Sequence, residues 1–190
     1  MTLPDTSVLQ VGTQICFADH AGDFAPAASA TLEQGTPTDV QLSLASVADA
    51  AARQSAKVDL GASRAPFYDV MAVFEFAATP VAGDVVELYW APSPSATAGN
   101  ANPGNVTGAD AAFTGTPSTL AVAVAELQHI GNFKCTEDPT AVLQTAYIGS
   151  FCPTQRYGTL VVKNESAAAF HSDDVECHVV FTPIIHALID

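Results

Sequence analysis

The chain has 190 residues with 20 acidic and 6 basic side chains, so its formal net charge at pH 7 is −14. A chain of this length suits a single domain, residues 1–190, whose hydrophobic core needs no disulfide or metal to hold it. Because a general nucleic-acid binder needs clustered Lys and Arg to neutralise phosphates, this charge argues against nucleic acid as a partner. An acidic surface also discourages contact with anionic membranes.

Neither a membrane segment nor a secretory signal is expected. No stretch approaches the roughly 20 apolar residues of a membrane-spanning helix, and Met1–Asp5 lacks the basic-then-apolar layout of a signal peptide. The four cysteines stand singly, at Cys16, Cys135, Cys152 and Cys177. This spacing does not match a zinc site and predicts reduced, partly buried thiols. We therefore expect a protein that is made in a cytoplasm and holds no metal or cofactor.

The N-terminal third of the chain predicts three short strands separated by irregular segments. Alternating apolar residues predict the first strand over Val8–Phe17. Residues 18–37 follow with scattered Gly and Pro and little periodicity, which indicates a long loop or extended arm. Further strands are predicted over Val40–Leu44 and Ala56–Leu60. The Ala-rich segment Ala45–Ala56 is open to a short helix by propensity, although strand signals crowd it on both sides.

The stretch Phe67–Trp90 predicts a β-hairpin, because two alternating halves are separated by residues with turn chemistry. The even-numbered residues, including Tyr68 and Trp90, are expected to face the core. The other face of the first half is also apolar, since it carries Met71 and Val73. We therefore expect that second face to be buried against another subunit.

The second half of the chain predicts a long loop and then four strands. Residues 91–119 are rich in Pro, Gly and small side chains, which indicates a long inserted loop. A solvated loop, a loop ordered against a neighbouring subunit and a ligand-binding lid all remain open. Strand patterns resume from Leu120, and the strands are predicted over Leu127–Lys134, Val142–Phe151, Thr159–Lys163 and Val175–Thr182.

These elements predict an all-β fold, a two-sheet antiparallel β-sandwich with long loops. The strands are unevenly spaced, with long excursions after the first strand and after Trp90, and the Cys, Trp, Cys spacing of immunoglobulin domains is missing. A jelly roll is therefore favoured over an immunoglobulin-like sandwich.

The densest polar cluster lies in Phe170–Glu176, where His171, Asp173, Asp174 and Glu176 stand close together. Such carboxylates could supply oxygen ligands for Ca²⁺, but the EF-hand loop pattern is absent. The cluster is interpreted as a solvated turn, with a metal site and a subunit contact as the alternatives.

The remaining candidates for chemistry are weak. No two histidines stand two residues apart, as they do in the metal site of a cupin. His129 is interpreted as a hydrogen-bonded residue of the core or of an interface. His178 is interpreted as an outward-facing residue of the last strand. Glu75 and Glu87 could form a glycosidase pair if they project from adjacent strands, but exposed carboxylates on a hairpin are commonplace. No nucleophile-elbow, phosphate-loop, dinucleotide-binding or metalloprotease motif is present. We therefore expect no enzyme, and no catalytic, cofactor-binding or metal-binding residues. Tyr89 is the clear aromatic candidate on an open face, so the sequence leaves a carbohydrate-binding jelly roll open as an alternative.

Several phrases in the chain resemble a family of small structural proteins from tailed-bacteriophage genomes. The phrases are Arg53–Gly61, Glu87–Gly99, Arg156–Asn164 and His171–Glu176, and the likeness runs from about residue 40 onward. The resemblance implies a virion component, first of all a capsid decoration or cement protein, with a head-tail or tail-surface structural protein as a further alternative. It also implies a homotrimer on the capsid surface, with the major capsid protein as partner, after synthesis in the host cytoplasm. No catalytic residue is carried over from the family.

Three residues are predicted as possible subunit contacts: Met71, Val73 and Tyr89. The first two come from the second apolar face of the predicted hairpin, and Tyr89 from the open face of its other half.

Overall fold

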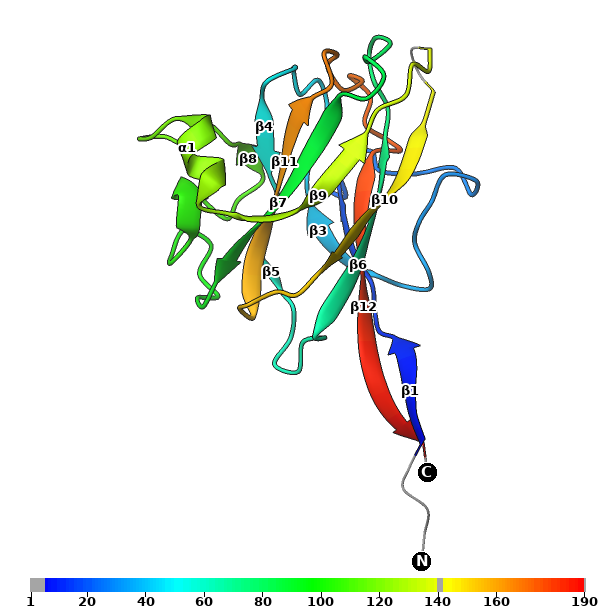
Figure 1. Cartoon of the computed structure of the whole chain (residues 1–190), viewed down its shortest axis with the longest axis vertical. Coiled ribbons are helices and arrows are strands. Elements are labelled where there is room, and N and C mark those ends of the chain that lie inside the picture. Colours follow the sequence, from blue (N-terminus) through cyan, green and yellow to red (C-terminus); the bar gives the residue numbers. More distant parts are fainter. Residues whose placement is uncertain (1–5, 140–141, 190) are drawn as a thin grey trace, which may run out of the picture.

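The computed structural model describes residues 6–139 and 142–189, which form two six-stranded β-sheets packed face to face (Figure 1). Sheet A has the strand order β10-β6-β12-β2-β3, with β1 paired to β12. Its strands are β1 (Thr6–Val11), β2 (Ile15–Ala18), β3 (Thr38–Gln41), β6 (Phe67–Phe74), β10 (Gln144–Phe151) and β12 (His178–Ile189).

Sheet B has the strand order β8-β4-β11-β7-β9, with β5 paired to β11. Its strands are β4 (Ala52–Gln54), β5 (Val58–Asp59), β7 (Val85–Ser93), β8 (Ala111–Ala112), β9 (Gln128–Lys134) and β11 (Tyr157–Glu165). Two short helices lie in the segment between β7 and β9: the 3-10 helix η1 (Pro103–Asn105) and α1 (Leu120–Ala125).

The order of the strands is that of a jelly roll, as predicted. Along the sequence the chain crosses between the sheets, from β2 and β3 in sheet A to β4 and β5 in sheet B, back to β6, and across again to β7. The late strands then insert between the early ones, because β12 lies between β6 and β2 and β11 lies between β4 and β7. This is the double Greek-key arrangement. Among the described strands, all pairs are antiparallel except β2 with β3, which is parallel.

The predicted hairpin Phe67–Trp90 is wrong in its pairing. Its two halves are the strands β6 and β7, and they belong to opposite sheets. They meet instead through their side chains across the core, where Tyr68 and Phe74 share one cluster with Leu88 and Trp90. Alternation shows that a strand has one buried face but does not identify its hydrogen-bonding partner, so the same pattern fits two strands that face each other across a sandwich.

Aromatic rings fill the interior between the sheets. The indole of Trp90 is fully buried, as predicted, with its ring centroid 5.7 Å from that of Phe151 and 5.7 Å from that of Phe181. Phe74 packs against Phe133 and Phe170 at 4.9 Å and 5.0 Å. The core therefore joins residues that are far apart in the sequence.

The first predicted strand, Val8–Phe17, is in fact two strands, and only the second lies in the body of the sheet. The strand is interrupted at Gly12, which packs closely against β12: an added Cβ would lie 2.9 Å from Cγ of Pro183. β1 pairs only with the end of β12, and the two form a ribbon that projects from the sandwich (Figure 1). The last strand was predicted over Val175–Thr182, before Pro183, yet β12 begins at His178 and continues to Ile189.

Residues 18–37 were predicted as a loop or arm; Ala18 belongs to β2, and residues 19–37 pack onto the outer face of sheet A. Phe24 and Leu32 cover a cluster of Cys16, Ala18 and Val180. His178 was placed correctly on the outer face of its strand, but this segment covers it completely, so it has no exposed surface.

The buried imidazole of His178 is held as the neutral tautomer. Its Nε2 accepts a hydrogen bond from the Leu32 N–H at 3.0 Å, and its Nδ1–H donates to the Glu176 carbonyl at 2.7 Å. Burial lowers the pKa of His178, although Glu176 and Glu33 favour its protonation. Protonation at Nε2 would also remove the acceptor for Leu32, so the packing of residues 19–37 depends on a neutral ring.

We expect the wild type to lose stability relative to a His178→Gln variant as the pH falls below about 6.5, the unfolded value for histidine. The folded pKa is the lower one, so the stabilising contribution is complete above about pH 6.5 and is lost as the pH falls toward the folded pKa, by at most about 1.4 kcal/mol per pH unit. Denaturant unfolding of both proteins between pH 7.5 and 5 measures the difference between their free energies of unfolding. The titration of carboxylates affects both proteins equally and cancels in this difference. Parallel pH profiles would contradict this role of His178.

Part of the long segment 91–119 packs on the outer face of its own sheet, whereas residues 97–101 and 116–119 are exposed. Val106 and Phe113 are buried against Ala91 and Val161 of sheet B. Helix α1 completes this layer where a strand pattern was expected from Leu120 onward. Thr119 is the N-cap of this helix, since its Oγ1 accepts a hydrogen bond from the N–H of Val122 at 3.4 Å.

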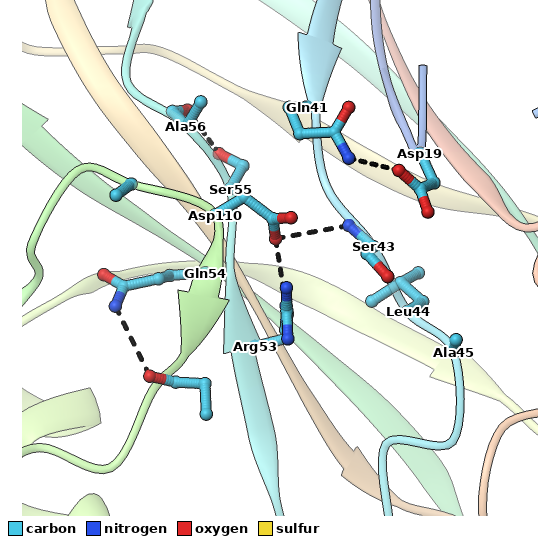
Figure 2. A network of polar contacts seen from close by, with 12 residues as sticks. Asp19, Gln41, Ser43, Leu44, Ala45, Arg53, Gln54, Ser55, Ala56 and Asp110 are labelled. Carbon is cyan, nitrogen blue, oxygen red and sulfur yellow. Dashed lines mark hydrogen bonds and ion pairs between the residues drawn. The ribbon is translucent and has the colours of Figure 1, made fainter. Parts of the chain in front are cut away.

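Polar contacts fasten this segment to the strands beneath it. Asp110 accepts a hydrogen bond from Arg53 Nε at 2.9 Å and another from the Ser43 N–H at 3.2 Å, which ties the segment to β4 and to the chain after β3 (Figure 2). Lys57 Nζ donates to the carbonyls of Ser95, Thr97 and Asn100. The possible helix over Ala45–Ala56 is replaced by turns and by β4, which pairs with β11 and β8.

Candidate functional site

The three predicted contact residues do not form one surface. Met71 is 36% exposed on the outer face of sheet A, whereas Tyr89 is half-buried on the outer face of sheet B. Val73 has 0% exposure. The expectation that its side chain reaches a partner is therefore wrong: this part of β6 is buried on both faces within the chain itself.

The outer face of sheet A carries an exposed pair of Met71 and Tyr147. The two residues are direct partners in the register of β6 and β10, and directly paired residues share a face. Tyr147 is 58% exposed, whereas strict alternation in the predicted strand Val142–Phe151 puts its side chain on the same face as Phe151. A bulge between Tyr147 and Gly149 shifts the register and turns the two rings to opposite faces.

An apolar row crosses the same outer face nearer the projecting ribbon. We use this name for Val11, Ile184 and Phe67, which are consecutive partners on β1, β12 and β6. Val11 is 58% exposed and Phe67 is 52% exposed. The sequence did not single out either residue, because the row exists only through pairing between strands at the two ends of the chain and in its middle.

The outer face of sheet B has a polar groove beside Tyr89, with a volume of about 570 Å³. Its charged lining consists of Asp49, Asp84, Glu87, Lys163 and Glu165. Lys163 Nζ donates to Glu87 at 2.8 Å and pairs with Glu165 at 2.7 Å. The phenol of Tyr89 donates to the same Glu87 oxygen at 3.0 Å. The groove therefore has a fixed network with an excess of negative charge.

The electrostatics of this network keep Glu87 ionised and Tyr89 protonated. Burial opposes ionisation of Glu87, but hydrogen bonds from Lys163 and Tyr89 outweigh it and lower its pKa. Burial and the hydrogen bond to Glu87 raise the pKa of Tyr89 to about 12. Tyr89 lies against His129, with 5.2 Å between ring centroids. His129 is exposed rather than in the core, and its Nε2 contacts Asn132 Oδ1 at 2.7 Å.

The two carboxylates considered as a glycosidase pair lie on different sheets. Glu75 follows β6 of sheet A, and Glu87 lies on β7 of sheet B. Burial raises the pKa of Glu75, whose carboxylate lies 3.9 Å from Nδ1 of His171. The structure therefore does not bring Glu75 and Glu87 together on adjacent strands, because the hairpin that would have done so does not form.

The polar cluster at Phe170–Glu176 is only partly a solvated turn. Asp174 is 3% exposed, and its Oδ2 accepts hydrogen bonds from the N–H groups of Leu44 and Ala45 at 2.6 Å and 2.9 Å. Carboxylate oxygens of Asp19, Asp23 and Asp174 lie within 4.8 Å of one another. Asp174 thus serves mainly as an acceptor for a backbone turn, a role that the sequence pattern does not reveal.

In the described ranges, no helix combines the length and apolarity that crossing a membrane requires.

Comparisons with known proteins found no relative of this chain. Neither protein-family models nor curated proteins nor solved structures gave a match.

Proposed function

We propose that this chain is a non-enzymatic structural virion protein that decorates or cements a bacteriophage capsid, with the major capsid protein as its partner. The phage context comes from the phrases that resemble tailed-phage structural proteins. The observation that carries the structural role is the exposure of large hydrophobic side chains on the outer face of sheet A, Val11 with Phe67 and Met71 with Tyr147. Asp69 lies between Phe67 and Met71 on this face, and its Oδ1 accepts a hydrogen bond from the Tyr147 phenol at 3.5 Å. Large hydrophobic side chains that are exposed on one face are typical of a protein contact surface.

The fold supports a role in assembly. The segment 19–37 covers part of one outer face and the segment 91–119 covers part of the other. Two of the open surfaces, the Met71–Tyr147 pair and the groove beside Tyr89, lie on opposite sheets. A protein that links neighbours in a shell needs contact surfaces on more than one side.

Purified virions provide the test. We expect the chain in a fixed ratio to the major capsid protein and on the capsid surface when labelled antibodies locate it by electron microscopy. Labelling confined to the head-tail junction or the tail would favour the alternative of a head-tail or tail-surface protein. Absence of the chain from virions would exclude all of these roles.

A Met71→Asp variant is expected to fold normally and to bind capsids at least about tenfold more weakly, because a desolvated charge in an apolar contact costs more than the roughly 1.4 kcal/mol of a tenfold change. Met71 is 36% exposed, and exposed substitutions usually change stability by less than about 0.5 kcal/mol. Co-sedimentation with capsids that lack the chain measures the binding.

The matched control is Val122→Asp, since Val122 is 53% exposed on α1, on the side of sheet B. It should bind capsids as the wild type does. If Met71→Asp unfolds the domain, or binds as tightly as the wild type, then the outer face of sheet A is not the capsid contact.

A carbohydrate-binding role remains the second candidate because an aromatic ring borders a polar groove on sheet B. Sugars bind through stacking on such rings together with hydrogen bonds to fixed polar groups. A glycan array with the wild type and a Tyr89→Ala variant tests it. Binding that disappears in the variant would favour this function, and a silent array would remove its support.

A further inference from the structure

Residues 19–37, which we call the cover, lie on the outer face of sheet A and form no strand or helix of their own. More than half of these residues are exposed. The large apolar anchors of the cover are Phe24 and Leu32, which pack over Cys16, Ala18 and Val180. A segment with so few buried apolar side chains is of the kind that opens locally while the rest of a protein stays folded.

The cover conceals the continuation of the exposed Met71–Tyr147 pair. Met71 is the register partner of Tyr147 on one side and of Val180 on the other, and Val180 is in turn the partner of Cys16. Directly paired residues share a face, so these four side chains form one row across the outer face of sheet A. Val180 and Cys16 are 1% and 0% exposed beneath the cover. Removal of the cover would therefore extend the exposed apolar surface along this row.

The backbone of the cover is fastened to β12 and to the turn before it. The Leu32 N–H donates to Nε2 of His178 at 3.0 Å, and the Ala27 N–H donates to the Glu176 carboxylate at 3.2 Å. The ring of Phe24 lies against the imidazole of His178, with 5.3 Å between the ring centroids. His178 therefore holds the cover at two points, Leu32 and Phe24.

Protonation of His178 is incompatible with this arrangement. Its Nδ1–H already donates to the Glu176 carbonyl, so an added proton goes to Nε2, where it would face the Leu32 N–H. Two donors that face each other in a buried site leave both without an acceptor. The charged ring would also lack solvation beneath the cover, and release of the cover returns the ring to water.

The other charged groups around His178 do not remove this conflict. Burial lowers the pKa of His178 and outweighs Glu33 of the cover and Glu176, which both favour the protonated ring. His20, at the start of the cover, disfavours a charge on His178. Nδ1 of His20 lies 3.8 Å from a carboxylate oxygen of Asp39, so a protonated His20 has an anionic partner in place. His178 is therefore the histidine whose protonation works against the cover.

We propose that the cover is released by acid: protonation of His178 detaches residues 19–37 from sheet A while the sandwich stays folded, and the released state exposes the row from Tyr147 to Cys16. The inference goes beyond the capsid role, because release is a property of the free chain and requires no partner. Failure to bind capsids would refute the capsid role alone. A free chain that keeps its cover at low pH would refute the present inference alone.

The cysteines of the chain distinguish release of the cover from global unfolding. Cys152 is exposed, Cys16 lies beneath the cover, and Cys135 and Cys177 are buried in the main core. Burial raises the pKa of Cys135 to about 11 and that of Cys177 to about 12, and it also raises the pKa of Cys16. Each buried thiol must therefore be exposed before it reacts. Release of the cover exposes Cys16, whereas global unfolding exposes Cys135 and Cys177 as well.

Labelling of the full chain with dithiodipyridine between pH 7.5 and 5, followed by mass spectrometry of its peptides, tests the proposal. The labelling rate of the exposed Cys152 corrects for the pH dependence of the reaction itself. Relative to Cys152, labelling of Cys16 should accelerate by up to about tenfold per pH unit below about 6.5, the value of a solvated histidine, because release is coupled to the uptake of one proton. Cys135 and Cys177 should stay protected over the same range.

The variant His178→Gln keeps an acceptor for the Leu32 N–H and a donor for the Glu176 carbonyl, but it does not titrate. Its relative labelling of Cys16 should not change with pH. His20→Gln is the matched control, because His20 also contacts the cover through Phe24, at 4.9 Å between ring centroids, and this variant should respond to acid as the wild type does.

If His178→Gln already exposes Cys16 at pH 7.5, an NMR titration of the His178 ring in the wild type replaces it. The ring should then take up its proton over the same pH range in which Cys16 becomes reactive. Relative labelling of Cys16 that does not change with pH in the wild type overturns the proposal. It is also overturned if the buried thiols all react together, or if a covered His178→Gln protein responds to acid as the wild type does.

Discussion

Replacing Gly158 with Ala is expected to destabilise the fold by about 3 kcal/mol, at the upper end of the typical cost of overpacking a core. Gly158 is buried on β11 beside the indole of Trp90. A Cβ at this position would lie 2.1 Å from Cζ2 and 2.3 Å from Cε2 of Trp90. The indole ring cannot shift to make room for the new Cβ, because Phe151 and Phe181 pack against it. Urea unfolding of the purified variant measures the loss.

The same contact predicts the behaviour of Trp90 variants. Trp90→Ala should cost about 3–5 kcal/mol, the usual range for truncating a buried large aromatic residue. Trp90→Phe removes the indole atoms that meet the new Cβ, so it should relieve part of the damage caused by Gly158→Ala. The double variant is therefore expected to be at least about 1 kcal/mol more stable than the sum of the two single effects predicts.

Gly99→Ala is the matched control for Gly158→Ala, because a Cβ at Gly99 would meet no atom within 4 Å. It should leave the free energy of unfolding within about 0.5 kcal/mol of the wild type. A Gly158→Ala protein as stable as this control, or strictly additive effects with Trp90→Phe, would show that the indole does not occupy the space beside Gly158.

The fold class followed from the sequence because most strands bury one face and alternate accordingly. Leu88 and Trp90 were assigned to the core on this ground, and both are fully buried. Partner strands did not follow, because alternation is a property of one strand and pairing is a property of two. The false hairpin of Phe67–Trp90 arose from this difference.

Alternation also fails where a loop covers the outer face of a sheet. His178 and Val180 on β12 have outer-face positions yet are buried, because the segment with Phe24 and Leu32 lies over that part of sheet A. Val161 on β11 is buried in the same way beneath the segment 91–119. A loop of small residues gives no local signal of where it will pack, because its anchors are a few scattered side chains, such as Phe113 in the core layer and Asp110 in a hydrogen bond to Arg53.

The candidate contact surfaces were the least predictable part of the molecule. Met71 was found because it interrupts an alternating pattern with a second apolar face. Tyr147 was assigned to the wrong face because a bulge inserts one residue into its strand. Val11 and Phe67 become neighbours of Ile184 only when the two ends of the chain pair beyond the sandwich, and no short-range pattern contains that information.

Replacing Asp174 with Ala is expected to cost about 1–3 kcal/mol, because the buried backbone N–H of Leu44 would lose its acceptor. The N–H of Ala45, which is exposed, would lose the same acceptor at a smaller cost. Asp174→Asn should be nearly neutral at pH 7. Its amide oxygen can accept the same hydrogen bonds, and it removes a charge that lies close to Asp19 and Asp23.

The pH dependence separates the charge of Asp174 from its role as an acceptor. Burial raises the pKa of Asp174 although the two N–H groups oppose the shift. Because the folded state then holds the proton more tightly than the unfolded state, the wild type is favoured at low pH and loses this contribution as the pH rises through the folded pKa. Asp174→Asn lacks this loss, so its stability relative to the wild type should increase with pH from about 4, near the unfolded pKa of aspartate. Denaturant unfolding at pH 4 and 7 measures both effects. Equal destabilisation by Ala and Asn at pH 7 would mean that the turn requires the ionised carboxylate itself.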